Sequence, residues 1–430
     1  MNQEAILDLW RASGLGQRIM FTLAVIVVFR LGVHIPLPGV DLYTLEQLFK
    51  QGNILMGFLD LFSGGALVKF SLFAMGITPY INASIIMQLM TAVIPKLEEM
   101  QKEEGMEGRR RINQMSRYLT VALSLVQSFA LTNWLWRSGA VLGHPPHGAV
   151  PWMFFIHSIP VLMAGTIFIM WMGEQITERG LGNGASMLIF IGIIARIPTY
   201  MHNTSDLVEN NGASWFAVGI LLLVFFAMLV AIIYAQEGAR KIPVQSAKRQ
   251  VGKRIYGGQG TYIPLRVNQG GVMPIIFASS VLLFPATLHQ FVGLTWLRTI
   301  TDALMPSKPL YPILYFFLIV FFTFFYASIV LNPMDLANNL KKYGNFIPGY
   351  RPGVRTAEFL EKILTRITWI GAIFLGCIAL IPTYVENWTG VTTLQGLGST
   401  AILIMVGVAI DIFNQLQTHL IARQYEGLMR

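Results

Sequence analysis

The chain has 430 residues, of which 54% are hydrophobic and only 12% are charged. Soluble proteins carry about a quarter charged residues, so a water-soluble globule of this composition would expose apolar surface that it could not cover. The composition therefore excludes a soluble globule, a disordered chain and a nucleic-acid-binding domain. It indicates an integral membrane protein. The one cysteine, Cys377, has no partner with which to form a disulfide.

Ten apolar segments are long enough to cross a bilayer, whose hydrocarbon core needs roughly 20 residues of helix. We therefore expect an all-α polytopic membrane protein with ten transmembrane helices. The predicted spans are 19–36, 72–94, 118–136, 152–172, 185–200, 215–234, 272–291, 310–331, 367–384 and 397–413.

The positions of Lys and Arg predict the orientation of these spans. With the N-terminus inside, 24 of the 31 basic residues fall in inner segments, five fall in outer segments, and Arg30 and Arg196 lie within spans. This distribution follows the positive-inside rule. We expect both termini to be cytoplasmic and the protein to lie in the cell membrane.

Two long basic loops, residues 235–271 and 332–366, fall on the predicted cytoplasmic side. The first is typical of a hairpin, with strand-like residues 240–246 and 261–267 around a Gly-rich basic tip. The second carries two Pro-Gly turns around Arg351. Such loops either lie in solvent against anionic lipid headgroups or bind a partner, and the sequence by itself leaves both open.

The spans carry almost no charge near the bilayer midplane, where ion-driven solute transporters usually need it. Arg30, Arg196 and Asp411 lie toward span ends, where snorkelling or local pairing explains them. No catalytic, nucleotide-binding or metal-binding motif is present, and we expect no cofactor. A ten-span solute transporter is thus disfavoured, and an intramembrane enzyme has no catalytic group of residues.

Residues 54–70 form an apolar run that is too short to cross the membrane and is interrupted by Gly64 and Gly65. Such a run is either an interfacial helix or a re-entrant segment buried in protein, and general experience favours the interfacial helix. A short helix broken by glycine is expected to contribute little to the core of the bundle.

Several long motifs resemble the SecY family, the channel subunit of the protein-translocation machinery. The resemblance covers essentially the whole chain, in order. The segment 96–105 resembles cyanobacterial or plastid members, for which the thylakoid membrane is the alternative to the cell membrane. The motifs are LFSGGAL (61–67), GITPYINASIIMQLM (76–90), PKLEEMQKEEGMEGRRRINQ (95–114), ERGLGNGAS (178–186), IPVQSAKRQVGKR (242–254), GGVMPIIFASS (270–280), IPGYRPG (347–353) and ARQYEG (422–427).

The resemblance implies two inverted five-helix halves, residues 1–200 and 201–430, around a central pore. It also implies that a short re-entrant helix, about residues 58–70, closes the pore as a plug, which reverses the interfacial interpretation. The implied plug residues are Leu59, Leu61, Phe62, Ser63, Gly64, Gly65 and Leu67.

The resemblance further implies an apolar pore ring and a polar lateral gate. A ring of branched side chains holds water poorly, blocks ions by desolvation and still yields around a passing chain. From the residues alone, an Ile in a span faces lipid or packs, and a polar residue bonds its own helix backbone. The implied ring is Ile81, Ile85, Ile189, Ile276 and Ile404, and the implied gate residues are Thr91, Gln127 and Asn268.

The function that the resemblance implies is a passive protein-conducting channel with a lateral exit into lipid. Because the chain has no nucleotide-binding motif, the SecA ATPase or a translating ribosome would supply the energy. The expected partners are SecE, SecG, SecA, the ribosome through its RNA phosphates, signal peptides, nascent chains and anionic lipids. The expected docking residues are Arg351, Arg240, Lys248, Arg249, Lys253 and Arg254.

Overall fold

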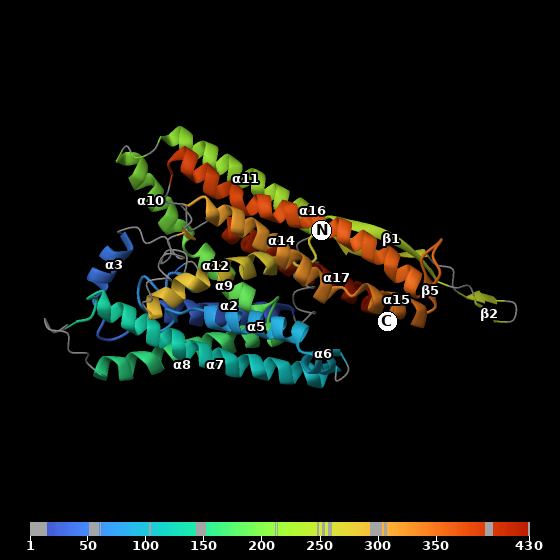
Figure 1. Ribbon diagram of the computed structural model, residues 1–430, viewed down its shortest axis with the longest axis horizontal. Coiled ribbons are helices and arrows are strands. Elements are labelled where there is room, and N and C mark those ends of the chain that lie inside the picture. Colours follow the sequence, from blue (N-terminus) through green and yellow to red (C-terminus); the bar gives the residue numbers. More distant parts are fainter. Residues whose placement is uncertain are drawn as a thin grey trace. The chain divides into compact units, whose positions relative to one another are not determined.

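The computed structural model describes a helical protein that divides into two compact units (Figure 1). Unit 1 comprises Met1–Val218, Leu283–Asp302 and Thr389–Arg430, and unit 2 comprises Gly219–Leu282 and Ala303–Trp388. The predicted division into halves 1–200 and 201–430 stays a prediction. The described residues are 15–50, 60, 62–102, 105–142, 152–210, 212, 214–246, 249–251, 254–256, 260–292, 303–304, 308–391 and 399–428.

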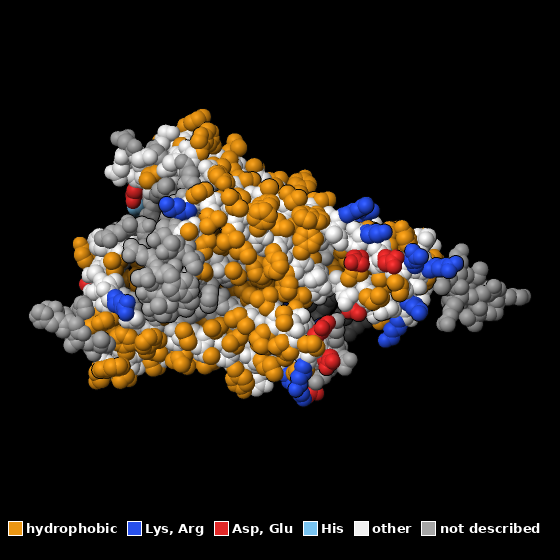
Figure 2. All heavy atoms as spheres, viewed as in Figure 1, with side chains coloured by type: hydrophobic (Ala, Val, Ile, Leu, Met, Phe, Trp, Pro, Cys, Tyr) orange, Lys and Arg blue, Asp and Glu red, His pale blue; other side chains and the backbone are white. Residues whose placement is uncertain are grey.

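Each of the ten predicted spans coincides with helix. Over the described residues, eight helices are long and apolar enough to cross a membrane, or nine if the bent pair α5–α6 is one span. The seventh predicted span lies in α12, whose portion Met273–Leu282 is a shorter apolar helix. Large apolar side chains on the helices are exposed, among them Phe226 and Phe317, and such a surface is stable in lipid. Figure 2 shows this apolar surface.

Unit 1 contains nine helices over its described residues. Within it, α7 packs against both α5 and α8, and α9 packs against α8 and α17 (Figure 1). The helices are α2 (Leu15–Val33), α3 (Leu42–Lys50), α5 (Thr78–Val93), α6 (Pro95–Lys102), α7 (Gly105–Arg137), α8 (Trp152–Arg179), α9 (Gly184–Ile194), α10 (Ile197–Glu209) and α17 (Ser399–Leu428).

Two proline residues shape these helices. Pro95 follows Ile94, which is extended because the proline ring excludes the helical conformation before it, and the chain bends by 103° between α5 and α6. Pro198 stands near the start of α10, just after the break at Ala195 and Arg196. The predicted fifth span is therefore two consecutive helices that extend to Glu209.

The second predicted span begins later than expected, because α5 starts at Thr78 and not at residue 72. The residues before it form a buried turn segment, defined here as Asp60 and residues 62–77. Helical residues in this segment are confined to Asp60, Phe62 and Ser63, and turns follow from Gly64. Lys69 is the one exposed residue among those described in the segment. The segment is therefore enclosed in protein, as a re-entrant segment would be, and is not an interfacial helix.

The turn segment also contributes to the core, contrary to the sequence-based expectation for this stretch. Leu67, Phe70, Ala74 and Met75 belong to a hydrophobic cluster with residues of α3, α7 and α8. Ala66 and Phe70 are fully buried. The expectation was wrong because it considered helix length, whereas the burial comes from side chains in turns that several helices surround.

Unit 2 contains the second group of helices and the five strands found among the described residues. Rings hold its helices together: Phe277 packs edge-on against Phe322, and Phe324 against Trp369. The helices are α11 (Trp215–Glu237, in unit 2 from Gly219), α12 (Met273–Val292, in unit 2 to Leu282), α14 (Leu310–Val330), α15 (Pro333–Lys342) and α16 (Val354–Thr389). The strands are β1 (Ala239–Ser246), β2 (Arg249–Val251), β3 (Arg254–Tyr256), β4 (Gly260–Arg266) and β5 (Asn345–Phe346).

The predicted hairpin is confirmed, since β1 pairs antiparallel with β4 from Ala239–Arg266 to Gln245–Gly260. The structure adds a strand that the sequence did not reveal: β5, from the second basic loop, pairs with the other edge of β1. The two loops therefore form one small domain (Figure 1). Its core joins the sheet to the first turns of α16 and consists of Ile242, Val244, Leu265, Ile347, Leu360, Ile363, Leu364 and Ile367.

Candidate functional site

Three glycines, one on each of three helices, enclose the turn segment of unit 1. A Cβ on Gly32 of α2 would overlap the ring of Phe73, and one on Gly165 of α8 would overlap the carbonyl oxygen of Leu72. Small residues let backbones approach closely, which is how helices pack in membranes. The segment therefore packs directly against the backbones of α2 and α8, because Gly32 and Gly165 have no side chain that would occupy this space.

The third glycine contact joins the turn segment to α9. Gly64 has a φ of +67°, which glycine adopts without strain, and a Cβ on it would lie 2.8 Å from the Cα of Gly192. Ile189 stands three residues before Gly192 on α9, so the two lie on the same helix face. The first turn of the segment thus contacts the face of α9 that carries Ile189, one of the five predicted pore-ring residues.

All five predicted ring residues are buried. The exposed fractions are 7% for Ile81, 5% for Ile85, 2% for Ile189, 5% for Ile276 and 1% for Ile404. None of these side chains is exposed to lipid, which excludes one of the two ordinary interpretations of an Ile in a span. Ile276 lies in unit 2 and the other four in unit 1. The ring itself stays a prediction.

Within unit 1, four of the predicted ring residues lie on α5, α9 and α17, which pack against α8 or against each other. These residues are Ile81, Ile85, Ile189 and Ile404. Ile81 and Ile85 stand one turn apart on α5, which packs on α7 and α8. α9 packs against α17, and the backbone N–H of Gly182 donates to Oε1 of Gln415 at 2.8 Å. The glycine-rich turn before α9 therefore positions α9 against α17.

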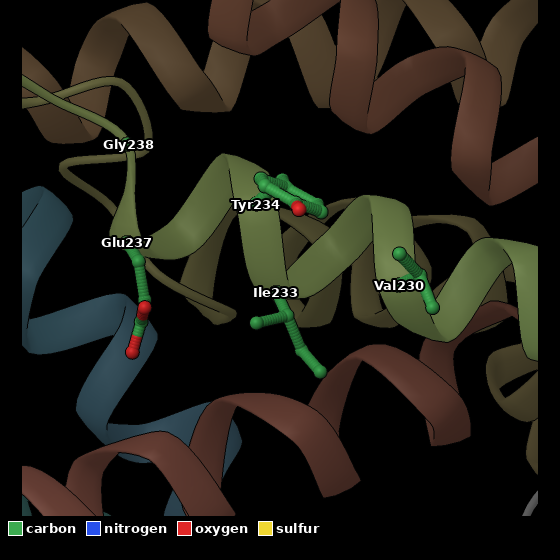
Figure 3. Close-up of a pocket in the computed structure, with 5 residues that line it drawn as sticks. All are labelled: Val230, Ile233, Tyr234, Glu237 and Gly238. Atoms are coloured by element: carbon green, nitrogen blue, oxygen red, sulfur yellow. The ribbon is translucent and has the colours of Figure 1, made fainter.

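The described part of unit 2 has a surface hollow. The hollow, of about 560 Å³, lies at the end of α11, lined by Val230, Ile233, Tyr234, Glu237 and Gly238. Figure 3 shows the side chains of Ile233 and Glu237 pointing away from that of Tyr234. The two polar side chains that line the hollow, Tyr234 and Glu237, therefore do not point toward a common position. Among the described residues, no group of three or more His, Cys, Asp or Glu could hold a metal ion.

Comparison with known proteins decides the family. The SecY family model matches residues 71–413. The protein translocase subunit SecY of Synechococcus elongatus is 47% identical over 436 residues, covering 100% of this chain and 97% of that protein. The SecY subunits of Streptomyces scabiei and Aquifex aeolicus are 45% and 41% identical, and each comparison covers at least 98% of both chains. The chain belongs to the SecY family.

Solved channels of this family share the fold. A SecY structure whose plug domain is described as stabilising the closed state and maintaining a membrane seal superposes with a TM-score of 0.66 at 18% identity. A structure described as a protein-conducting channel gives 0.63 at 17% identity. Both comparisons cover 94% of this chain and 92% of the other. The sequence-based recognition of the family and of its fold is confirmed.

The predicted lateral-gate residues of this SecY chain make mostly local bonds. Thr91 is buried and donates to the carbonyl oxygen of Gln88 at 2.8 Å, within its own helix. Asn268 is buried, and its Nδ2 donates to the carbonyl oxygen of Gly271 at 2.8 Å. Gln127 is half-buried on α7. In this conformation Thr91 and Asn268 therefore bond backbone groups of their own segments, which is the ordinary alternative to a bond across a gate.

The predicted docking residue Arg351 is exposed on a tightly held turn. The N–H of Tyr350 donates to the carbonyl of Ile347 at 3.1 Å, across a turn whose Gly349 has a φ of +87°. The ring of Tyr350 stacks on Phe359 with centroids 4.0 Å apart, and the hydroxyl of Thr356 donates to the carbonyl of Arg351 at 2.8 Å. Contacts on both sides thus fix the backbone that presents the Arg351 side chain.

The structure describes some of the remaining predicted docking and plug residues, while others lie outside the described residues. Arg240 is exposed on β1. Arg249 and Arg254 lie in the paired strands β2 and β3. Leu59, Leu61, Lys248 and Lys253 lie outside the described residues. Phe62, Ser63, Gly64 and Leu67 of the predicted plug are buried, and Gly65 is half-buried.

Proposed function

We propose that this chain is the channel-forming subunit of a protein translocase, which passes unfolded secretory polypeptides across the membrane and releases apolar segments sideways into the bilayer. Relatives that cover the whole chain are named as SecY translocase subunits, and this is the observation that carries the proposal. The buried isoleucines support an apolar constriction, since branched side chains exclude water and ions yet move aside for a polypeptide.

The turn segment is proposed as the plug of this channel. It is largely buried and lies against the Ile189 face of α9. It consists mainly of turns, which change conformation more readily than a long helix. The fold is shared with a SecY channel whose plug domain maintains a membrane seal. Deletion of residues 59–68, or displacement of this first part of the segment, should therefore open a path for ions.

The energy and the partners belong to the same proposal. SecA or a translating ribosome supplies the driving force, SecE and SecG complete the complex, and the basic loops face the cytoplasm with both termini. A solved relative is Sec61 in a canine ribosome–channel complex, which supports a ribosomal partner for this fold. The membrane is the cell membrane or the thylakoid, and anionic lipid headgroups bind the basic loops.

Reconstitution tests the proposal directly. The purified chain with SecE in liposomes should import an unfolded precursor when SecA and ATP are added, and should import none without ATP. Uptake of a small solute driven by an ion gradient, with no precursor import, would favour the ten-span solute transporter instead.

Neutralising the hairpin tip should weaken partner binding in a salt-dependent manner. Replacing Lys248, Arg249, Lys253 and Arg254 by Gln removes four cations that attract acidic protein surfaces or RNA phosphates. Salt already screens these contacts in the wild type, so the loss of affinity on neutralisation should be larger at low salt than at moderate salt. Titration of SecA or ribosomes at two salt concentrations measures this effect, and equal losses would contradict it.

Replacing Asn268 by Leu should relax the demand for a functional signal sequence. The Asn268 amide holds the turn before α12 through the carbonyl oxygen of Gly271, and a hydrogen bond in a membrane protein contributes about 0.6–2 kcal/mol, so the closed–open balance should shift by about 1 kcal/mol toward open. Thr120→Val is the matched control, because Thr120 is buried and its hydroxyl bonds within its own helix, but it is not one of the predicted gate residues. Import of precursors with defective signals is the measurement, and rejection as strict as in wild type would contradict the proposed gate.

A further inference from the structure

Asp60 is a fully buried carboxylate at the start of the turn segment. Its Oδ1 accepts hydrogen bonds from the backbone N–H groups of Leu67 at 3.1 Å and Val68 at 3.0 Å, and from the Ser63 hydroxyl at 3.3 Å. One carboxylate oxygen therefore closes the turn of the segment on itself. A buried charge of this kind also requires a partner of opposite charge.

That partner comes from the neighbouring span. The guanidinium of Arg196 pairs with the second carboxylate oxygen, Oδ2. Arg196 stands at the break between α9 and α10, and its guanidinium lies over the ring of Tyr200, 5.6 Å from the centroid. Its side chain is 18% exposed, compared with 0% for that of Asp60. The ion pair therefore joins the turn segment to the end of α9.

A second arginine holds the next turn of the same segment. Nη1 of Arg30, on α2, donates to the carbonyl oxygen of Gly64 at 3.1 Å. Gly64 is also the residue that contacts Gly192 of α9. Two arginines from two spans thus bind groups four residues apart, at the place where the segment meets the Ile189 face.

We propose that Arg196 and Arg30 form a two-arginine latch that holds the turn segment in its closed position, with the Asp60–Arg196 ion pair as the principal contact. The inference deepens the proposed function, because it rests on the turn segment being the plug. It assigns roles to Arg30 and Arg196, two of the three charged residues within spans that the sequence explained only by snorkelling or local pairing.

The latch predicts an unusual order of effects. Arg196→Gln leaves the carboxylate of Asp60 buried and unpaired, which destabilises the closed position most. Asp60→Asn leaves a partly exposed guanidinium, which water can solvate, so its effect should be smaller. In the double variant no buried charge is unpaired. Adding Asp60→Asn to Arg196→Gln should therefore reduce the defect.

The resting ion leak of the reconstituted complex measures the latch. In planar bilayers without SecA or precursor, Arg196→Gln should raise the resting conductance by at least about tenfold, equivalent to about 1.4 kcal/mol in the closed–open balance. The double variant should leak less than Arg196→Gln. Lys69→Gln is the matched control, since it removes the exposed cation of the same segment and should leave the leak at the wild-type level.

Thiol labelling provides a second readout that is independent of conductance. Replacing Cys377, the one cysteine of the chain, by Ser gives a background in which Ala66→Cys is a single probe in the segment. Ala66 is 0% exposed, so a membrane-impermeant maleimide should label the probe slowly. Labelling should become faster when Arg196→Gln is added.

Two results would overturn the latch: a wild-type leak and labelling rate in Arg196→Gln, or a double variant that leaks more than either single variant. Precursor import, assayed on the same vesicles with SecA and ATP, separates this outcome from a failure of the proposed function. If wild type imports no precursor, the translocase proposal is wrong. If wild type imports precursor and Arg196→Gln stays sealed, only the latch is wrong.

Discussion

Arg351→Glu should reduce SecA-driven import by about a hundredfold or more while leaving membrane insertion and stability unchanged. Truncating one partner of a charge pair in an interface removes about 2–5 kcal/mol, and charge reversal adds repulsion. The turn that presents Arg351 is held by the Tyr350–Phe359 stack and the Thr356 hydroxyl. Because that turn is already fixed, little entropy is lost when a partner binds it, and most of the interaction energy appears as affinity.

Arg355→Glu is the matched control for this prediction. Arg355 is an exposed cation only four residues away, and its nearest ion-pair contact is a loose one of 3.8 Å to Glu358. Equal charge reversal at this position should reduce import far less, because the fixed turn does not present it. The measurements are ATP-dependent precursor import and SecA affinity. Normal import by Arg351→Glu would show that the loop is only a connection between helices.

Gly165→Leu should prevent stable assembly of the protein. A Cβ at this position would overlap the carbonyl oxygen of Leu72, and this contact is with backbone, which cannot rotate away as a side chain does. Overpacking of an ordinary core costs about 1–3 kcal/mol, and a backbone overlap should reach or exceed that range. The turn segment would be forced out of its position between α2 and α8.

Gly219→Leu tests whether the effect of Gly165→Leu is local. Gly219 lies on α11, and a Cβ added there would meet no other atom within 4 Å, so the same substitution should change stability by less than about 0.5 kcal/mol. The fraction of protein that stays monodisperse after heating in detergent measures both variants. Equal heat resistance of Gly165→Leu and wild type would mean that the turn segment does not pack against α8 as described.

The sequence determined the class of protein and the course of most helices. All ten predicted spans coincide with helix, because about 20 consecutive apolar residues have few alternatives in a bilayer other than a helix that satisfies its own backbone. The hairpin of β1 and β4 was also predictable, since both strands are local and a Gly-rich tip joins them. The family followed from motifs spread along the chain.

The sequence could not reveal the arrangement of the turn segment. The contacts of Gly32, Gly165 and Gly192 with this segment join positions far apart in the chain, and a glycine in a span carries no sign of what approaches it. The pairing of Asp60 with Arg196 is equally non-local. Hydropathy placed Arg196 toward the end of a span and left Asp60 inside the apolar run 54–70, because it counts residues along the chain and not their neighbours in space.

The sequence by itself determined what had to be helical and buried in lipid, because hydrophobic length and backbone hydrogen bonding are local properties of a chain in a membrane. Only the tertiary structure decided that β5 completes the sheet of the first basic loop and that a segment of turns lies largely buried among three helices. The tertiary structure also decided that the buried carboxylate of Asp60 pairs with Arg196. These features depend on close contact between distant segments, and such contact exists only once the helices have packed.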